Sequence, residues 1–357
     1  MKKQHLLLAL IFLVITVGSF VYTKHNGSTH GRQTSEIRIG LAIALTGFAA
    51  DMGKPEANAV EILRQKYPNA KFYIEDTKSD PQAGLKAAQK LLEIDKVNVM
   101  YCDLSNVANA VVPLTEDHNA IFMATVYLSD FVTRGQYTIR NLPTGKYESQ
   151  LLLSELARIR PTSTKIAAIV SNDEFGRSSL SDFKQALSET PNKLVYDGTF
   201  ENDPAKMKSV AQVLISQNAD AIYISSLSPA LGTLIRNLRE AQYSGQIMTT
   251  DAFALDYIRA AAGDAQRGVL YPKFMNTPKL QELDREYRKR FGEPIPTTAT
   301  LCHEGLSLLL DAWKSSPRLA FSAFIKSLGN MEYDSAFGRL TVTGREIKYP
   351  MIPTIVE

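Results

Sequence analysis

Cysteine is scarce in this chain of 357 residues, where only Cys102 and Cys302 occur. Two such distant cysteines supply no Cys-x-x-Cys pair for zinc or redox chemistry. Neither of them follows the N-terminal apolar run as a lipid acceptor. A cysteine-based zinc or redox site and a lipoprotein are therefore excluded, whereas one disulfide and two buried free thiols stay open as alternatives.

Catalytic and cofactor motifs are also missing. The chain has no Gly-x-Gly-x-x-Gly after a strand and no Gly-x-Ser-x-Gly elbow, and residues 47–55 miss the phosphate-loop pattern by one residue and by a proline at the magnesium position. His25 and His30 lie close together but in a polar tether, where a held metal geometry is not expected. His303 and Glu304 are neighbours on an expected helix and should point apart. We therefore expect a protein that is not an enzyme and needs no cofactor or metal.

No long run of one charge is present either. The 40 basic residues are spread among 37 acidic ones, for a formal charge of +3. A nucleic-acid-binding protein would concentrate its basic residues on one face. We expect no nucleic-acid partner.

The N-terminus has the features of an export signal. Two lysines, Lys2 and Lys3, precede an uncharged stretch over residues 6–22, and a polar tether runs from there to Ser35. Residues 1–35 are thus expected to be a signal peptide, or in the alternative an uncleaved anchor, followed by the tether. Either form predicts a periplasmic location.

From residue 36 onward, short β-branched runs alternate with amphipathic helical stretches, which predicts an α/β fold with parallel sheets flanked by helices. Asp80-Pro81 and Asp203-Pro204 each supply a helix cap with proline at the first helical position. The expected strands are residues 37–43, 71–75, 97–101, 120–124, 165–170, 194–199, 221–225, 246–250 and 268–274, with two shorter ones near 338–342 and 351–356.

The alternation is interrupted near Pro143 and then starts again, so two sheets are expected rather than one. Helices over 278–291, 300–314 and 317–328 then follow one another before the last strands. We assign residues 36–143 and 276–329 to lobe I, and residues 144–275 and 330–357 to lobe II.

Polar residues stand directly after several strands, where open parallel sheets bind ligands. Ser105 and Asn106 open a helix, so a hydroxyl and free backbone N–H groups could bind a carboxylate there. Ser129 could add a hydroxyl, and Asp251 an acid for a ligand ammonium. Helix capping is the alternative role of both Ser105 and Asp251.

Several motifs resemble the type I periplasmic binding proteins, specifically the branched-chain amino-acid-binding receptors of ABC transporters. They are Leu45-Thr46-Gly47 after the first strand, Asp80-Pro81-Gln82-Ala83, and the run from Val170 to Gly176. The resemblance covers residues 36–357. It implies two Rossmann-like lobes that are joined by three hinge crossovers and close on a ligand.

The resemblance also implies roles for individual residues. Ser105 and Ser129 would hold a ligand carboxylate, the Tyr127 carbonyl and Asp251 would bind its amino group, and Phe175 would form an aromatic wall. Two positions depart from the group: Leu227 replaces a tyrosine, and Met52 replaces an aromatic residue. An amide or another carboxylate is therefore an alternative to an amino acid.

The expected function is that of an extracytoplasmic receptor that delivers a small amino acid, carboxylate or amide to a membrane permease of the ABC type. The alternative of another class is a tethered sensory subunit with the same fold. Fold alone does not separate the two, because function lies in the site and its partner.

Overall fold

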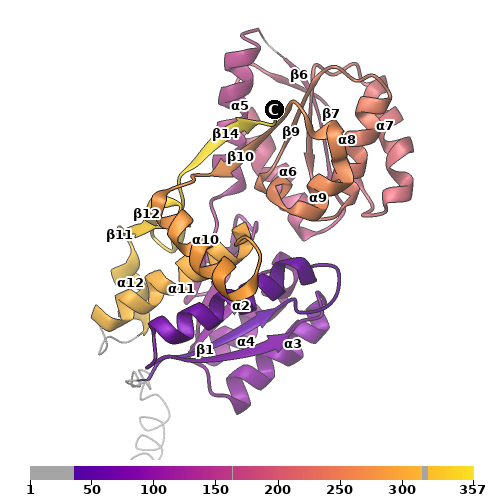
Figure 1. Cartoon of the computed structure of the whole chain (residues 1–357). Coiled ribbons are helices and arrows are strands. Elements are labelled where there is room, and N and C mark those ends of the chain that lie inside the picture. The colour runs from indigo at the N-terminus through magenta and orange to yellow at the C-terminus, as the bar shows by residue number, and fades with distance from the viewer. Residues whose placement is uncertain (1–35, 163, 316–320) are drawn as a thin grey trace, which may run out of the picture.

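The computed structural model describes residues 36–162, 164–315 and 321–357. They form two lobes, each built on one sheet with helices packed against it (Figure 1). The first sheet has the strand order β11-β12-β13-β5-β4-β3-β1-β2 and the second β14-β10-β9-β8-β6-β7. The predicted α/β class is confirmed. The expected signal peptide and tether lie outside the described residues.

The first lobe is assembled from two stretches of chain. The first stretch contains β1 (Arg38–Ile43), α2 (Ala50–Lys66), β2 (Lys71–Asp76), α3 (Pro81–Gln89), η1 (Lys90–Ile94), β3 (Val99–Cys102), α4 (Ser105–Asp117), β4 (Ile121–Ala124), η2 (Phe131–Thr133) and β5 (Thr138–Arg140). The second contains α10 (Pro278–Phe291), α11 (Thr297–Ser315), α12 (Phe321–Leu328), β11 (Glu332–Ser335), β12 (Gly338–Thr343) and β13 (Glu346–Lys348).

The second lobe contains the remaining elements. They are α5 (Gly145–Ile159), β6 (Lys165–Ser171), α6 (Glu174–Leu187), β7 (Lys193–Phe200), η3 (Pro204–Lys206), α7 (Met207–Ser216), β8 (Ala221–Ser225), α8 (Ala230–Glu240), β9 (Gln246–Thr249), η4 (Asp251–Ala254), α9 (Asp256–Ala262), η5 (Gly263–Gln266), β10 (Val269–Phe274) and β14 (Met351–Ile355).

The central strands run parallel and are buried on both faces, as the β-branched runs predict. β1 pairs with β2 and β3, and β8 pairs with β6 and β9, all in parallel. The predicted cap at Asp80 is confirmed, since its side chain accepts a hydrogen bond from the Ala83 N–H at 2.9 Å. Asp203 instead caps the short η3 turn that precedes α7.

The assignment of residues 330–357 to lobe II is wrong for most of this segment. Strands β11, β12 and β13 extend the first sheet, and only β14 joins the second, antiparallel to β10. The reason lies in pairing across the chain: Glu346 aligns with Arg140 of β5, and the Arg140 guanidinium binds the Glu346 carboxylate at 2.6 Å. The described chain thus passes between the lobes after β5, after β10 and after β13.

These three passages contact one another and form the hinge. The Tyr349 hydroxyl, after β13, donates to the Asn141 amide oxygen at 2.7 Å, after β5. The Tyr349 ring also lies edge-on to Phe274 at the end of β10, with 6.0 Å between ring centroids. All three passages therefore share one packed cluster, which holds the two lobes together at their narrow junction (Figure 1).

Two further features answer questions that the sequence left open. Cys102 and Cys302 are buried free thiols, so they form no disulfide. None of the helices in the described ranges has an apolar stretch long enough to cross a membrane.

Candidate functional site

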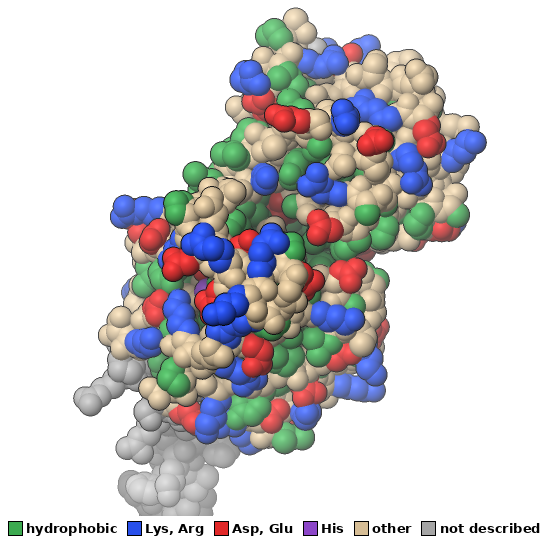
Figure 2. All heavy atoms as spheres, in the orientation of Figure 1, with side chains coloured by type: hydrophobic (Ala, Val, Ile, Leu, Met, Phe, Trp, Pro, Cys, Tyr) green, Lys and Arg blue, Asp and Glu red, His purple; other side chains and the backbone are tan. Residues whose placement is uncertain are grey.

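Two adjoining cavities lie between the lobes, in the hollow that separates them in Figure 2. Ser105, Phe175 and Leu227 belong to the walls of both. The outer cavity, of about 370 Å³, is also lined by Phe48, Leu104, Asn106, Asp173, Glu174, Asn202, Ser228 and Pro229. The inner cavity, of about 60 Å³, is also lined by Met52, Asp103, Thr125, Tyr127, Leu142, Asp251, Ala252, Ala254, Leu255, Thr297, Thr298 and Leu301.

The walls come from the carboxyl ends of strands in both sheets, as expected for open parallel sheets. Ser105 follows β3 and Tyr127 follows β4, while Leu227 follows β8 and Asp251 follows β9. The two lobes thus present their strand ends to each other. Of the seven predicted site residues, only Ser129 lines neither cavity.

Ser105 lines both cavities and is not the cap of α4. It is the first residue of α4, and the capping position, Leu104, makes no side-chain hydrogen bond. The Ser105 hydroxyl oxygen accepts from the Tyr127 N–H at 3.2 Å. Its own hydrogen is left to donate to a ligand, beside the N-terminal end of α4 that favours negative charge.

Asp251 is likewise no cap, because η4 starts at Asp251 itself and has no side-chain cap. Its carboxylate accepts a hydrogen bond from the Tyr127 hydroxyl at 2.6 Å, and its N–H donates to Glu148 at 3.1 Å. Burial raises the pKa of Asp251 to about 6. Burial, followed by the Asp251 charge, raises the pKa of Glu148 well above its usual value. Burial therefore favours the protonated form of Glu148 beside Asp251.

The apolar wall is formed across the lobes. The Phe175 ring of α6 lies edge-on to the Tyr127 ring, with 4.5 Å between centroids. Phe175 and Met52 are both nearly buried, whereas Phe48 at the outer cavity is 63% exposed. An apolar ligand side chain could pack against Phe175 and Phe48.

The structure places Ser129 outside the site, which corrects the expectation that it lines the ligand pocket. Ser129 is exposed, and its N–H donates to the Ser178 hydroxyl of α6 at 3.2 Å. The same Ser178 hydroxyl donates to the Tyr127 carbonyl at 2.7 Å. This carbonyl, which was expected to accept from a ligand amine, already has one partner across the lobes. Thr125 is the residue after β4 that brings a hydroxyl to the inner cavity.

Asp103 and Thr298 are among the inner-cavity residues that were not predicted from the sequence. Asp103 follows β3 and stands two residues before Ser105, so the strand-end rule that selected Ser105 also applies to it. Thr298 comes from α11, on the distant C-terminal stretch, and no local pattern marks it.

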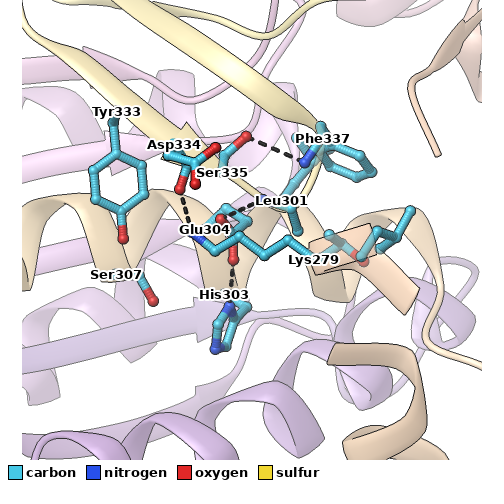
Figure 3. A network of polar contacts seen from close by, with 12 residues as sticks. Lys279, Leu301, His303, Glu304, Ser307, Tyr333, Asp334, Ser335 and Phe337 are labelled. Carbon is cyan, nitrogen blue, oxygen red and sulfur yellow. Dashed lines mark hydrogen bonds and ion pairs between the residues drawn. The ribbon is translucent and has the colours of Figure 1, made fainter. Parts of the chain in front are cut away.

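The prediction that His303 and Glu304 point apart is wrong. On α11 the His303 Nδ1 lies 2.8 Å from a Glu304 carboxylate oxygen, and both residues are buried (Figure 3). The other Glu304 oxygen accepts from the Ala336 N–H at 2.7 Å in the turn between β11 and β12. Neither residue lines either cavity. This network joins α11 to the β11–β12 hairpin.

No group of three or more His, Cys, Asp or Glu side chains in the described part of the chain is placed to hold a metal ion. The two cavities present hydroxyls, amides, carboxylates and apolar walls.

Comparison with known protein families shows to which family this chain belongs. The family model described as "Periplasmic binding protein" matches residues 36–349. The chain belongs to the periplasmic binding protein family. The resemblance of its motifs to the type I, branched-chain amino-acid-binding group is thereby confirmed, together with the two-lobed fold.

Three relatives illustrate the range of this family. A leucine-, isoleucine-, valine-, threonine- and alanine-binding protein from Pseudomonas aeruginosa is 20% identical over 94% of this chain and 93% of its own length. A leucine-binding protein from Thermotoga maritima is 18% identical, with a TM-score of 0.77 over 90% of this chain and 95% of that one. The solute-binding protein of an ABC transporter from Rhodopseudomonas palustris BisB5, solved with 3,4-dihydroxybenzoic acid, is 21% identical, with a TM-score of 0.80 over 91% of this chain and 94% of that one.

Proposed function

We propose that this protein is the extracytoplasmic receptor of an ABC-type importer and binds a small amine-bearing ligand, such as an amino acid or amino amide, between its lobes. The observation that carries this proposal is the meeting of Ser105 from the first lobe with Asp251 from the second in the wall of one cavity. The proposal is one of binding rather than of catalysis.

In this proposal the two ends of the ligand are recognised by different lobes. The Ser105 hydroxyl and the N-terminal end of α4 bind a carboxylate or carbonyl oxygen, and Asp251 binds the amino group. Burying either charged end without a partner is costly, so the lobes should close stably only on ligands that match both.

The relatives bind different ligands. The acidic side chain of Asp251 favours one of these ligand classes for this chain. One is named as binding aliphatic amino acids, and another was solved with a dihydroxybenzoic acid. A benzoate has no ammonium and would place a second negative charge near Asp251. We therefore propose an amine-bearing ligand for this chain and exclude simple aromatic carboxylates from the proposal.

The proposed partner is the membrane permease of the importer, which would receive the ligand from the closed receptor. The proposed location is the periplasm, which agrees with the family and with the expected export signal. Lobe closure about the hinge would be the signal that the permease reads.

A thermal-shift screen of the full-length chain against amino acids, amides and carboxylates tests the proposal. Ligands that bind the native state raise the unfolding midpoint. We expect α-amino compounds to raise it, and Ser105→Ala and Asp251→Asn to abolish the rise. Ser216→Ala and Asp197→Asn are matched controls, because both residues are exposed on the second lobe and line neither cavity. If carboxylates without an amino group stabilise the Asp251→Asn variant as well as the wild type, the proposal is wrong.

A further inference from the structure

Asp103 brings an unsatisfied carboxylate oxygen to the inner cavity. The residue follows β3 and is only 3% exposed. One of its oxygens accepts from the Ala44 N–H at 3.0 Å, while Oδ1 has no hydrogen-bond partner among the described residues. Since a buried acceptor without a partner is costly, Oδ1 should gain a donor when the cavity is filled.

Two further acceptors face the same cavity. The Thr298 hydroxyl oxygen of α11 is buried and also lacks a partner among the described residues. Asp251 belongs to the opposite lobe, and its carboxylate accepts from the Tyr127 hydroxyl on Oδ1 and from the Ala252 backbone N–H. The cavity of about 60 Å³ is large enough for a few water molecules or for one small polar group.

Positive charge is missing from these walls. Among the described residues that line the inner or the outer cavity there is no Lys, Arg or His, whereas Asp103, Asp173, Glu174 and Asp251 are present. The two outer acids have partners of their own: Asp173 accepts from the Gly176 N–H, and Glu174 lies 3.4 Å from Arg177. Asp103 and Asp251, in the inner cavity, are therefore the acids whose carboxylates can accept further hydrogen bonds from a ligand.

We propose that the inner cavity is a cation site in which a second ammonium or amidinium group of the ligand, beyond the amino group that Asp251 binds in the proposed function, bridges Asp103 of the first lobe and the Asp251 carboxylate of the second, with the Thr298 oxygen as a third acceptor. This inference rests on the proposed function and narrows its ligand class. An ammonium carries three donors, which matches these three acceptors. Because two carboxylates face one cation, ligands with an additional positive charge are preferred over zwitterions and anions.

The protonation of Asp103 gives the proposal a second readout. Burial raises the pKa of this carboxyl to about 7, so near neutral pH it is protonated in part of the molecules. The titratable groups around it are Glu56, Asp76, Tyr101, Cys102, Cys302 and Asp251. A cation that binds against Asp103 favours the ionised form and displaces that proton into the solvent.

Isothermal titration calorimetry of the full-length chain near neutral pH tests the cation site with matched ligands. Lysine and norleucine share the α-amino acid group and differ by the terminal ammonium, and cadaverine lacks the carboxylate. We expect lysine to bind at least about tenfold more tightly than norleucine, since a charge-assisted hydrogen bond is worth that much. Cadaverine should bind measurably, and titrations in two buffers of different ionisation enthalpy should reveal proton release.

Two variants test whether the lysine affinity and the proton release depend on Asp103. Asp103→Asn keeps an oxygen for the Ala44 N–H, and it should lower lysine affinity by at least about tenfold and suppress proton release. Asp182→Asn is the matched control: this carboxyl is also buried with one unpartnered oxygen, but it lines neither cavity. The wild-type comparison of lysine with norleucine needs no variant to fold.

The possible outcomes distinguish failure of the cation site from failure of the proposed function. If norleucine binds as tightly as lysine, or if Asp103→Asn binds lysine as the wild type does, the cation site is overturned while the proposed function stands. If no amino acid or amine binds the wild type, the proposed function itself fails.

Discussion

The Tyr127 hydroxyl of the first lobe donates a hydrogen bond to the Asp251 carboxylate of the second at 2.6 Å. Tyr127 also accepts from Ser178 through its carbonyl, and its ring lies against Phe175, so three contacts from the second lobe meet this one residue. A carboxylate accepts several hydrogen bonds, so Asp251 can keep Tyr127 while it binds a ligand ammonium. We infer that Tyr127 links ligand recognition to lobe closure.

Tyr127→Phe should therefore favour the open state. The variant keeps the ring but loses one inter-lobe hydrogen bond, which is worth about 1 kcal/mol. We expect a larger radius of gyration for the ligand-free protein in small-angle X-ray scattering and an affinity lowered about fivefold. Tyr243→Phe is the control, since its hydroxyl donates to the Ala219 carbonyl within the second lobe and neither residue lines a cavity. An unchanged radius and affinity in Tyr127→Phe would contradict the link.

Phe48→Ala tests whether the exposed ring at the outer cavity contacts the ligand. The ring is 63% exposed, so its loss should change the free energy of unfolding by less than about 0.5 kcal/mol. If the ring is buried on the ligand, affinity should fall by roughly tenfold. Ile94→Ala removes another exposed apolar side chain, which lines neither cavity, and it should leave affinity unchanged. Equal affinities of Phe48→Ala and the wild type would remove Phe48 from the site.

The free energy of unfolding should depend on pH, because the site contains buried acids with shifted pKa values. In the folded protein the pKa of Asp103 is raised from 3.8 to about 7 and that of Asp251 to about 6, both by burial. Between the unfolded and folded values the native state binds more protons, so the free energy of unfolding falls as pH rises through this window. Each pKa unit corresponds to about 1.4 kcal/mol, so the decrease should reach a few kcal/mol.

Urea unfolding between pH 4.5 and 8 measures this dependence. Asp103→Asn should flatten the decline between pH 4.5 and 7, because its titration is removed. Asp197→Asn, an exposed acid, should keep the slope of the wild type. If the two variants have the same slope, the burial argument for Asp103 is wrong.

Replacing Glu304 should lower the stability of the protein, although this residue lies outside the proposed ligand site. Its carboxylate accepts from the Ala336 N–H and contacts His303, and these contacts keep its pKa below the usual value despite burial (Figure 3). Glu304→Ala should lower the free energy of unfolding near neutral pH by about 3 kcal/mol, since charged buried hydrogen bonds are lost. This contribution is present above the unfolded pKa and is lost as pH falls through the lowered folded value. Denaturant unfolding measures it.

Glu332→Ala is the control for Glu304, because Glu332 is exposed and pairs with Arg339 at the surface. Its loss should change the free energy of unfolding by less than about 1 kcal/mol. Equal costs for the two variants would contradict the structural role of the Glu304 network.

Local patterns predicted the buried strands of both sheets, because their β-branched runs differ clearly from the helices between them. β5, β11 and β13 are short and carry few such residues, and local patterns did not predict them. Their place is set by partners far away in the chain, as with the ion pair between Arg140 and Glu346. That long-range pairing is also why the C-terminal strands were assigned to the wrong lobe.

The candidate site also contains residues that local patterns predicted and residues that only long-range packing brings together. The strand-end rule placed Ser105 and Asp251 in the cavity walls, and applied more fully it would have included Asp103. Ser129 follows the same rule but lies in a turn that brings it to Ser178. Thr298 reaches the cavity only because α11 packs against the first sheet, which no local pattern encodes.

The most direct test of the account is to measure the affinity of the full-length wild type and of Asp251→Asn for norleucine and for hexanoate, which differ by the α-ammonium. We expect the wild type to bind norleucine but not to bind hexanoate measurably, and we expect Asp251→Asn to weaken norleucine binding by at least about tenfold. Equal binding of the two compounds, or norleucine binding that is indifferent to Asp251, would contradict recognition of an amine between the two lobes.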